Sequence, residues 1–220
     1  MTKGMPLFSL TLFLLATPLA AQNWSAGIAT GPFAFGKFME RTTRIGTETG
    51  SAKTTIQLTA SVRPGLAADI ERSFSDRWAV RLEGTFTNNS QLKVKNKNGG
   101  GVPLDAGKLD VTTWMMPIVF NFNRHGAFRV HIFGGPAYAS YDIHDTPGTT
   151  VFSGSRGRFG GAAGAGVQWW ISDDFAAEGN VSDIVTASPL ERSDFPAGTT
   201  GLTIPKPHNV HTTVGVRYRF

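Results

Sequence analysis

Residues 210–220 (VHTTVGVRYRF) alternate between two kinds of side chain up to the end of the chain. One parity is mainly apolar and consists of Val210, Thr212, Val214, Val216, Tyr218 and Phe220. The other is polar or small and consists of His211, Thr213, Gly215, Arg217 and Arg219. Successive side chains of a β-strand point to opposite faces, so the pattern predicts a strand with one apolar and one polar face.

The opposite end of the chain has the features of an export signal. Lys3 precedes an apolar run at residues 7–16 (LFSLTLFLLA), and small residues follow at 20–21. The run is too short for a helix that crosses a bilayer, which takes about 20 residues. We therefore predict a cleavable signal peptide at residues 1–21 and a mature domain at residues 22–220, with a retained anchor as the alternative. The chain contains no cysteine, so strand pairing and packing have to stabilise it.

Eight segments of the mature chain have strand character, and none shows a helical period of comparable length. They cover residues 24–38, 54–74, 78–94, 109–122, 127–143, 158–171, 175–187 and 209–220. The links between them alternate in length, with short ones at 75–77, 123–126 and 172–174 and long ones at 39–53, 95–108, 144–157 and 189–206. Short periplasmic turns and longer outer loops are typical of outer-membrane barrels. The sequence predicts an all-β fold, an eight-stranded antiparallel up-and-down transmembrane β-barrel.

The two faces of each strand distinguish this fold from a soluble lipocalin-like barrel, because a membrane barrel is apolar outside and polar inside. Even positions of residues 56–70, Leu58 among them, are apolar and are expected to face lipid. The expected inward face carries charges of both signs, at Arg63, Asp69, Glu71, Arg81, Glu83, Arg129, Glu178, Arg217 and Arg219. Side chains can fill a bore of eight strands, so we predict a paired network that plugs it. A permeation path lined by the same charges is the alternative.

Aromatic residues gather beside the short links, at Trp78, Phe122, Phe128, Trp169, Trp170, Phe175, Tyr218 and Phe220. Their placement predicts an aromatic girdle at the periplasmic interface. Trp170 breaks the alternation of its strand, since it falls on the polar parity. Pro117 cannot donate a ladder hydrogen bond, and a closed barrel has no edge, so a local bulge is predicted there.

Three stretches resemble a known family when they are taken together with the eight-strand layout. They are residues 134–138 (GGPAY), 166–175 (GVQWWISDDF) and 218–220 (YRF), and the likeness to OmpA-like and opacity-type small outer-membrane β-barrels covers residues 22–220. The resemblance implies a location in the cell outer membrane, reached through the periplasm. It also implies that Tyr218 and Phe220 form a signal for the barrel-assembly machinery. No peptidoglycan anchoring is expected.

The resemblance implies a structural or surface-interaction role, because many members have one. A narrow porin-like channel and a lipid A-modifying enzyme are the alternatives. An acyl hydrolase needs a nucleophile beside a base, and His131 has no serine at the adjacent positions of its face. His208 and His211 are three residues apart, so they point to opposite faces of their strand. We therefore predict a protein that is not an enzyme, with no metal site and no cofactor.

The long links carry many cations, most densely in residues 93–98 (KVKNKN). We predict that Lys93, Lys95 and Lys97 contact phosphates of lipopolysaccharide, because charge-assisted bonds to phosphate are strong. A solvated loop is the alternative. Outer-membrane lipid and lipopolysaccharide are the expected partners, and nucleic acid is not expected despite a pI of about 9.7. The sequence leaves the oligomeric state open.

Overall fold

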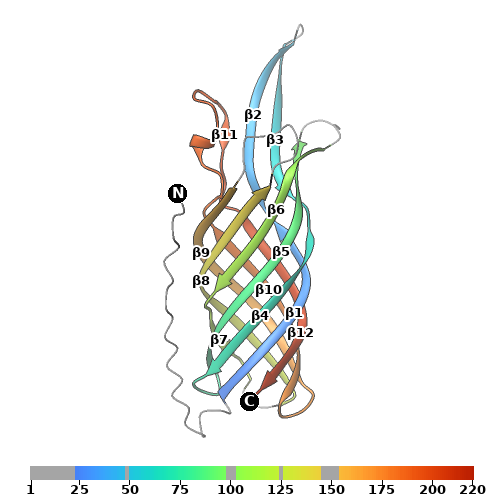
Figure 1. The fold of residues 1–220 in the computed structure, drawn as a ribbon, viewed down its shortest axis with the longest axis vertical. Coiled ribbons are helices and arrows are strands. Elements are labelled where there is room, and N and C mark those ends of the chain that lie inside the picture. Colours follow the sequence, from blue (N-terminus) through green and yellow to red (C-terminus); the bar gives the residue numbers. More distant parts are fainter. Residues whose placement is uncertain (1–22, 48–49, 98–102, 124–125, 145–153) are drawn as a thin grey trace, which may run out of the picture.

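A tall barrel of tilted strands forms most of the molecule and continues above one rim into a long hairpin (Figure 1). The computed structural model describes residues 23–47, 50–97, 103–123, 126–144 and 154–220. No helix within these ranges is long and apolar enough to cross a membrane. The predicted signal peptide lies outside the described residues.

Twelve antiparallel strands form a single sheet. They are β1 (Trp24–Phe35), β2 (Lys37–Thr47), β3 (Gly50–Ala60), β4 (Arg63–Ser73), β5 (Trp78–Asn96), β6 (Leu104–Met115), β7 (Ile118–Asn121), β8 (Phe128–His144), β9 (Gly154–Trp170), β10 (Phe175–Thr186), β11 (Leu202–Thr203) and β12 (His208–Arg219). β1 and β2, β3 and β4, and β6 and β7 are successive pieces of longer strands, and β11 belongs to the last outer link. The barrel itself is a closed, antiparallel ring of eight strands, which confirms the predicted fold.

The first and last strands close the ring. β1 pairs with β4 on one side and with β12 on the other, where Ser25 lies opposite Arg219 and Ile28 opposite Val216. β5 pairs with β6 to complete the circuit. Backbone groups inside a bilayer have to be hydrogen-bonded within the protein, and a closed ladder achieves this because it has no edge. The predicted pairing of the closing strand with the first strand is confirmed.

The outside of the barrel is apolar and the inside is mostly polar. On β12, Val214 and Val216 are exposed, whereas His211, Thr213 and Arg217 are buried. The aromatic residues beside the short turns are also exposed, with the exception of Trp170: they are Trp78, Phe122, Phe128, Trp169, Phe175, Tyr218 and Phe220. This distribution fits a barrel that is surrounded by lipid.

The alternation of inward and outward positions shifts at a bulge in the upper part of β5. Asn89 has a positive φ of 56° there, and its N–H donates to Asp110 Oδ1 at 2.6 Å. Asparagine tolerates this left-handed conformation better than most residues. On the neighbouring strand, the alternation of inward and outward positions shifts in the same way at the break between β3 and β4. Leu58 is consequently 3% exposed and packs beside Leu92 inside the barrel, so the expectation that Leu58 faces lipid is wrong.

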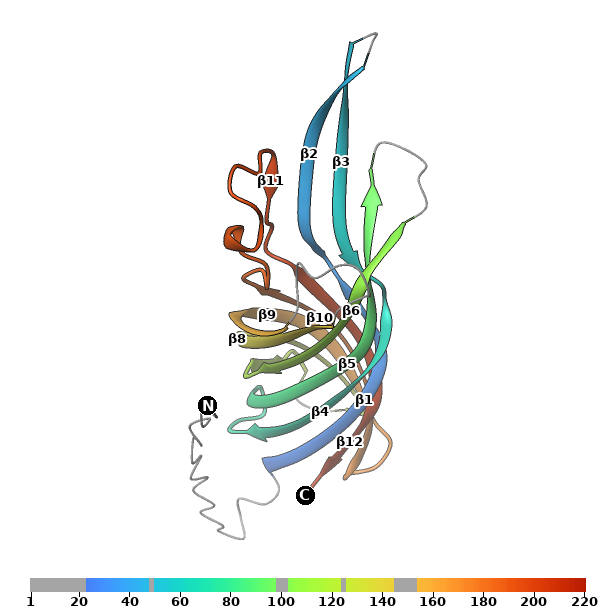
Figure 2. The same cartoon turned by 45° about the horizontal axis from the view of Figure 1, so that its top comes forward.

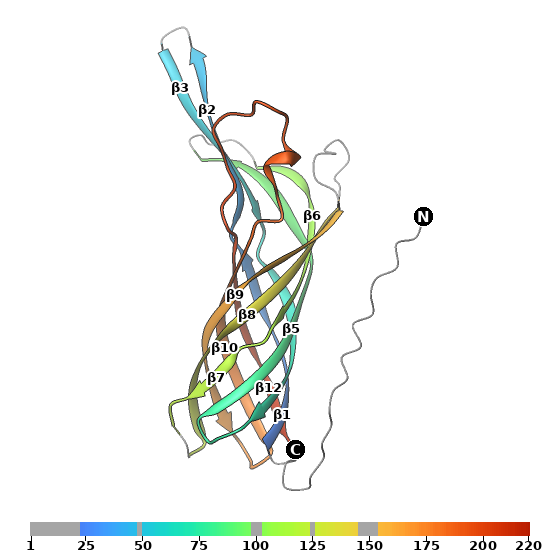
Figure 3. The ribbon, with the colours of Figure 1, turned by 90° about the vertical axis from the view of Figure 1, so that its left-hand side faces the viewer.

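The predicted outer link at residues 39–53 is largely a hairpin. β2 and β3 pair from Met39 opposite Leu58 to Thr47 opposite Gly50. Figure 3 shows the two strands rising well above the barrel. Threonine and isoleucine favour strands, but the glycines and charges of this stretch resemble loop composition. The molecule therefore carries a paired hairpin where a long link between strands was expected.

Pro117 interrupts the strand ladder without shifting it. Met115 lies opposite Glu83 and Ile118 opposite Val80, so the register with β5 is the same on both sides of the proline. The Pro117 carbonyl still accepts a hydrogen bond from the Arg81 N–H at 3.0 Å. The predicted bulge is wrong, because no residue is inserted and Pro117 lacks only the N–H of one ladder bond.

The assignment of the lipid-facing side can be tested on β12. Val214 lies midway along the strand and is 65% exposed, so Val214→Arg should lower the free energy of unfolding by about 2–4 kcal/mol, the cost of arginine near the bilayer midplane. Leu104→Arg is the matched control, because Leu104 is 69% exposed but lies at the outer end of β6. Urea unfolding in lipid bilayers measures both variants. Equal destabilisation would contradict the assignment.

Candidate functional site

A network of charged side chains fills the bore in the half nearer the short turns. Its members come from four strands and are Asp69, Glu71, Arg81, Glu83, Glu178 and Arg217. Arg217 is 1% exposed and connects three neighbouring strands. Its Nη1 donates to Ser25 Oγ at 2.9 Å, its Nη2 donates to Asp69 Oδ1 at 2.6 Å, and its Nε donates to Glu178.

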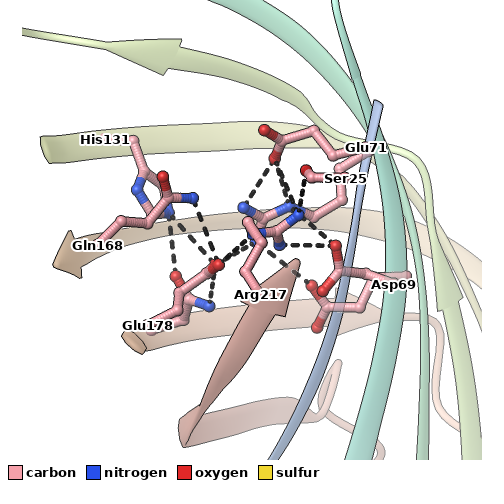
Figure 4. Close-up of polar contacts among 10 residues, drawn as sticks. Ser25, Asp69, Glu71, His131, Gln168, Glu178 and Arg217 are labelled. Atoms are coloured by element: carbon pink, nitrogen blue, oxygen red, sulfur yellow. Dashed lines mark hydrogen bonds and ion pairs between the residues drawn. The ribbon is translucent and has the colours of Figure 1, made fainter. Parts of the chain in front are cut away.

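Arg81 is the second cation of the network and is fully buried. Its Nε donates to Glu71 Oε2 at 2.9 Å, and its Nη1 lies 2.9 Å from Glu178 Oε1. Glu178 is therefore shared by both arginines, on the opposite side of the bore from Asp69 and Glu71 (Figure 4). Charges taken out of water have to be paired with good geometry, and the planar guanidinium can meet several carboxylates at once.

Neutral side chains complete the bonding of Glu178. Asn180 Nδ2 donates to Glu178 Oε1 at 2.7 Å, and Gln168 Nε2 donates to Glu178 Oε2 at 3.3 Å. His131 Nε2 lies 3.0 Å from Asn180 Oδ1. Sequence reasoning missed these residues because it looked for charges, although their inward parity was available as a signal. The surplus of carboxylates over arginines makes such neutral donors necessary.

Three of the predicted network residues lie elsewhere. Arg63 lies opposite Phe33, toward the outer end. Arg129 and Arg219 lie at the other end, where their guanidinium carbons are 5.0 and 3.8 Å from the centre of the Trp170 ring. Within the described part of the chain, none of the three arginines forms an ion pair. The predicted network of nine residues is thus a compact group of six and three separate arginines.

Apolar packing fills the bore on the outer side of the charges. A first layer is made by Met115, Val119, Phe133 and Ile184 with neighbouring alanines. An upper layer includes Phe38, Leu58, Leu92, Leu109 and Ile143. Tyr141 joins the upper layer and hydrogen-bonds Thr186 Oγ1 at 2.6 Å, while Asn209 Nδ2 donates to Tyr141 Oη at 2.7 Å. The inward side of the barrel is therefore not polar throughout, contrary to the simple alternation.

The last outer link folds over this upper layer, and we call residues 188–203 the outer cap. Leu190 is 3% exposed and packs into the apolar layer. Arg156 binds Asp194 through two bonds of 2.5 and 2.6 Å, and it also donates to Pro189 O at 2.8 Å. The Arg156 guanidinium holds the pKa of the Asp194 carboxyl below its usual range. Figure 2 shows the β11 segment of the cap standing above the rim, as β2 and β3 do.

Lys93 and Lys95 lie at alternate positions of β5 above its bulge, and Lys97 follows directly after the strand, where its N–H donates to Thr55 O at 2.8 Å, so the three predicted lysines share one face. Lys93 lies opposite Thr59 and Lys95 opposite Gln57 on β3. On the next pair of strands Arg44 lies opposite Lys53. Side chains directly opposite each other share a face of the sheet. We call these residues the cationic face: Arg44, Lys53, Lys93, Lys95 and Lys97.

His211 and His144 are held in structural contacts. The His211 ring stacks on Phe33 with a centroid distance of 4.0 Å, and both side chains are buried in the bore beside Ser182, which lies opposite His211 on β10. His144 Nε2 lies 3.0 Å from Asp110 Oδ2, and this hydrogen bond raises the pKa of His144. Among the residues that the structure describes, no group of three or more metal-ligating side chains could hold a metal ion.

Comparison with known proteins agrees with this architecture. The family described as "Outer membrane protein beta-barrel domain" matches residues 7–220. The chain belongs to this family. As a member of the outer membrane protein beta-barrel domain family, it is located in the outer membrane, with the short turns at the periplasmic end. No curated protein matches the chain.

Two solved structures show how far the likeness extends. The outer membrane protein OprG from Pseudomonas aeruginosa has a TM-score of 0.59 and 14% identity, over 91% of this chain and 98% of that one. Neisserial surface protein A has a TM-score of 0.51 and 10% identity, over 90% of this chain and 97% of that one. Such low identities show a shared fold and do not extend to activity.

The weight of the network in stability can be measured with Arg217→Met. The change removes the shortest ion pair of Asp69 and one of the two arginines that bind Glu178, so the free energy of unfolding should fall by about 3–5 kcal/mol. Arg63→Met is the matched control, because Arg63 also points inward but has no carboxylate partner among the described residues. Denaturant unfolding of both variants gives the comparison. A loss for Arg217→Met no larger than for Arg63→Met would show that the network adds little.

Proposed function

We propose that this protein is a closed, non-enzymatic barrel that acts at the cell surface, where its cationic face binds phosphate groups of lipopolysaccharide. The observation that carries the proposal is the filled bore. Arg81 and Arg217 are buried and paired across it, apolar side chains fill the next level, and Leu190 of the outer cap packs over them. A barrel packed in this way holds its outer sheet firmly and leaves little room for solutes.

The closed bore predicts the absence of a steady current. The protein reconstituted in a planar bilayer should show no steady ionic current, while a porin of known conductance in the same bilayer serves as the positive control. The charge network pairs its carboxylates with Arg81 and Arg217, and the apolar layers beyond it interrupt a charged path through the bore. A regular, persistent current from the unmodified protein would favour the channel instead.

The cationic face supports the second half of the proposal. Its five cations lie on adjacent strands of the outer sheet, with Glu40 as a neighbouring carboxylate that already accepts hydrogen bonds from Lys37 and Gln57. Phosphates of the outer leaflet are a dense layer of negative charge, and cations attract them at long range and by charge-assisted hydrogen bonds at contact. The adjacent strands fix the spacing of these side chains.

Substitution of the three lysines tests this role. The variant Lys93→Ala/Lys95→Ala/Lys97→Ala should bind purified lipopolysaccharide at least about tenfold more weakly, since each charge-assisted hydrogen bond is worth roughly 1.5–3 kcal/mol. Surface plasmon resonance at fixed ionic strength measures the affinity.

The control for this experiment removes the same number of charges elsewhere. Arg41→Ala/Arg72→Ala/Arg77→Ala takes its cations from the other face of β2 and from the periplasmic end. It should bind like the parent protein. Equal binding by the lysine variant and the parent would refute the role of the cationic face.

A further inference from the structure

A cavity of about 310 Å³ lies at the periplasmic end of the bore, beneath the charge network. Its walls include Trp24, Glu71, Asp76, Arg129, Trp170 and Arg219. Trp170 is the aromatic residue that falls on the polar parity of its strand. Arg129 and Arg219 were predicted to belong to the charge network, but they lie outside it. All three unexplained residues therefore meet in one cavity.

Both arginines are placed against the same indole ring. The guanidinium carbons of Arg219 and Arg129 lie 3.8 and 5.0 Å from the Trp170 ring centre. Cations bind well to the face of an indole, but two of them on a single ring also repel each other. Within the described residues, neither arginine has an ion pair or a side-chain hydrogen bond. An anion between them would remove this repulsion.

The unsatisfied polar atoms of the cavity are of one kind. Arg129 Nε and Trp170 Nε1 are buried and have no hydrogen-bond partner. A guanidinium and an indole N–H can only donate, so the missing group is an acceptor. Glu71 does not supply it, because its carboxylate is directed at Arg81 and forms no hydrogen bond or ion pair with Arg129, Arg219 or Trp170. Asp76 lies in the exposed turn at the edge of the cavity.

We infer that this cavity binds an oxyanion group, a phosphate or a carboxylate, which enters from the periplasmic side. Arg129 and Arg219 donate to its oxygens from their planar guanidinium groups, and Trp170 Nε1 donates an additional hydrogen bond. The group can come from a dissolved anion or from the headgroup of an inner-leaflet phospholipid, since both present the same oxygens. The site lies at the opposite end of the molecule from the cationic face and does not depend on it.

The indole N–H resonance of Trp170 reports on the site directly. In maltoside micelles, which contain no phosphate, titration with inorganic phosphate and with acetate should move this resonance in a saturable way, while chloride at equal ionic strength should not. Trp170→Phe assigns the resonance. Absence of a saturable shift with both phosphate and acetate would overturn the inference.

Nanodiscs that contain phosphatidylglycerol distinguish the two sources. If a lipid headgroup occupies the site, the resonance is shifted before any phosphate is added, and phosphate then has no further effect. If the ligand is a dissolved anion, the resonance starts at its position in micelles and still responds to phosphate. Both results support an oxyanion site.

Arg129→Gln and Arg219→Gln should each weaken phosphate binding by at least about tenfold. Arg72→Gln is the matched control, because the Arg72 guanidinium also lies over an indole, 5.4 Å from the Trp24 ring centre, but does not line the cavity. Arg219→Lys retains a cation and should give an intermediate affinity, even if the glutamine variants fold poorly. An unchanged Trp169 indole resonance, on the lipid-facing girdle, shows that a variant is folded. Equal affinities for Arg129→Gln, Arg219→Lys and Arg72→Gln would refute the site.

Discussion

The pairing of two buried arginines with carboxylates across a narrow bore is the interaction on which this structure depends. Lipid outside the barrel selects apolar side chains, so the polar residues of every strand have to point inward. A bore of eight strands has no room to hydrate them. Arg81 and Arg217 solve this problem by sharing Glu178, and their other partners, Asp69 and Glu71, come from the opposite wall. The result is a cross-link between walls that the backbone ladder alone would leave independent.

The sequence predicts the repetitive part of this arrangement well. The alternation in residues 210–220 predicts the closing strand and its two faces, because a lipid boundary imposes a period of two on each strand. The prediction fails where two neighbouring strands shift together, at Asn89 and at the break before Arg63. The two irregularities leave the register between these two strands unchanged, so the periodicity of either strand alone does not reveal them. Leu58 was misplaced for this reason.

The composition of the candidate sites was less predictable than the fold. Parity indicates that Arg63, Arg129, Arg217 and Arg219 face inward, but the height of each residue in the bore depends on strand tilt and stagger. Only Arg217 reaches the carboxylates, because β12 places it opposite Ala176 and beside Glu178 on β10. Cooperation between residues of distant strands is therefore a property of the closed ring. The outer cap is a similar case, since Leu190 is one apolar residue in a polar link.

The contacts of Arg217 have a consequence for the order of folding. Its bond to Ser25 joins residues 192 positions apart, and its bond to Asp69 joins residues 148 positions apart. Contacts of such long sequence separation form slowly, because much chain entropy is lost before they are made. Until β12 is in place, the nascent barrel holds an excess of carboxylates that repel one another. Closure of the ring and pairing of Asp69 and Glu178 with Arg217 are thus one cooperative event.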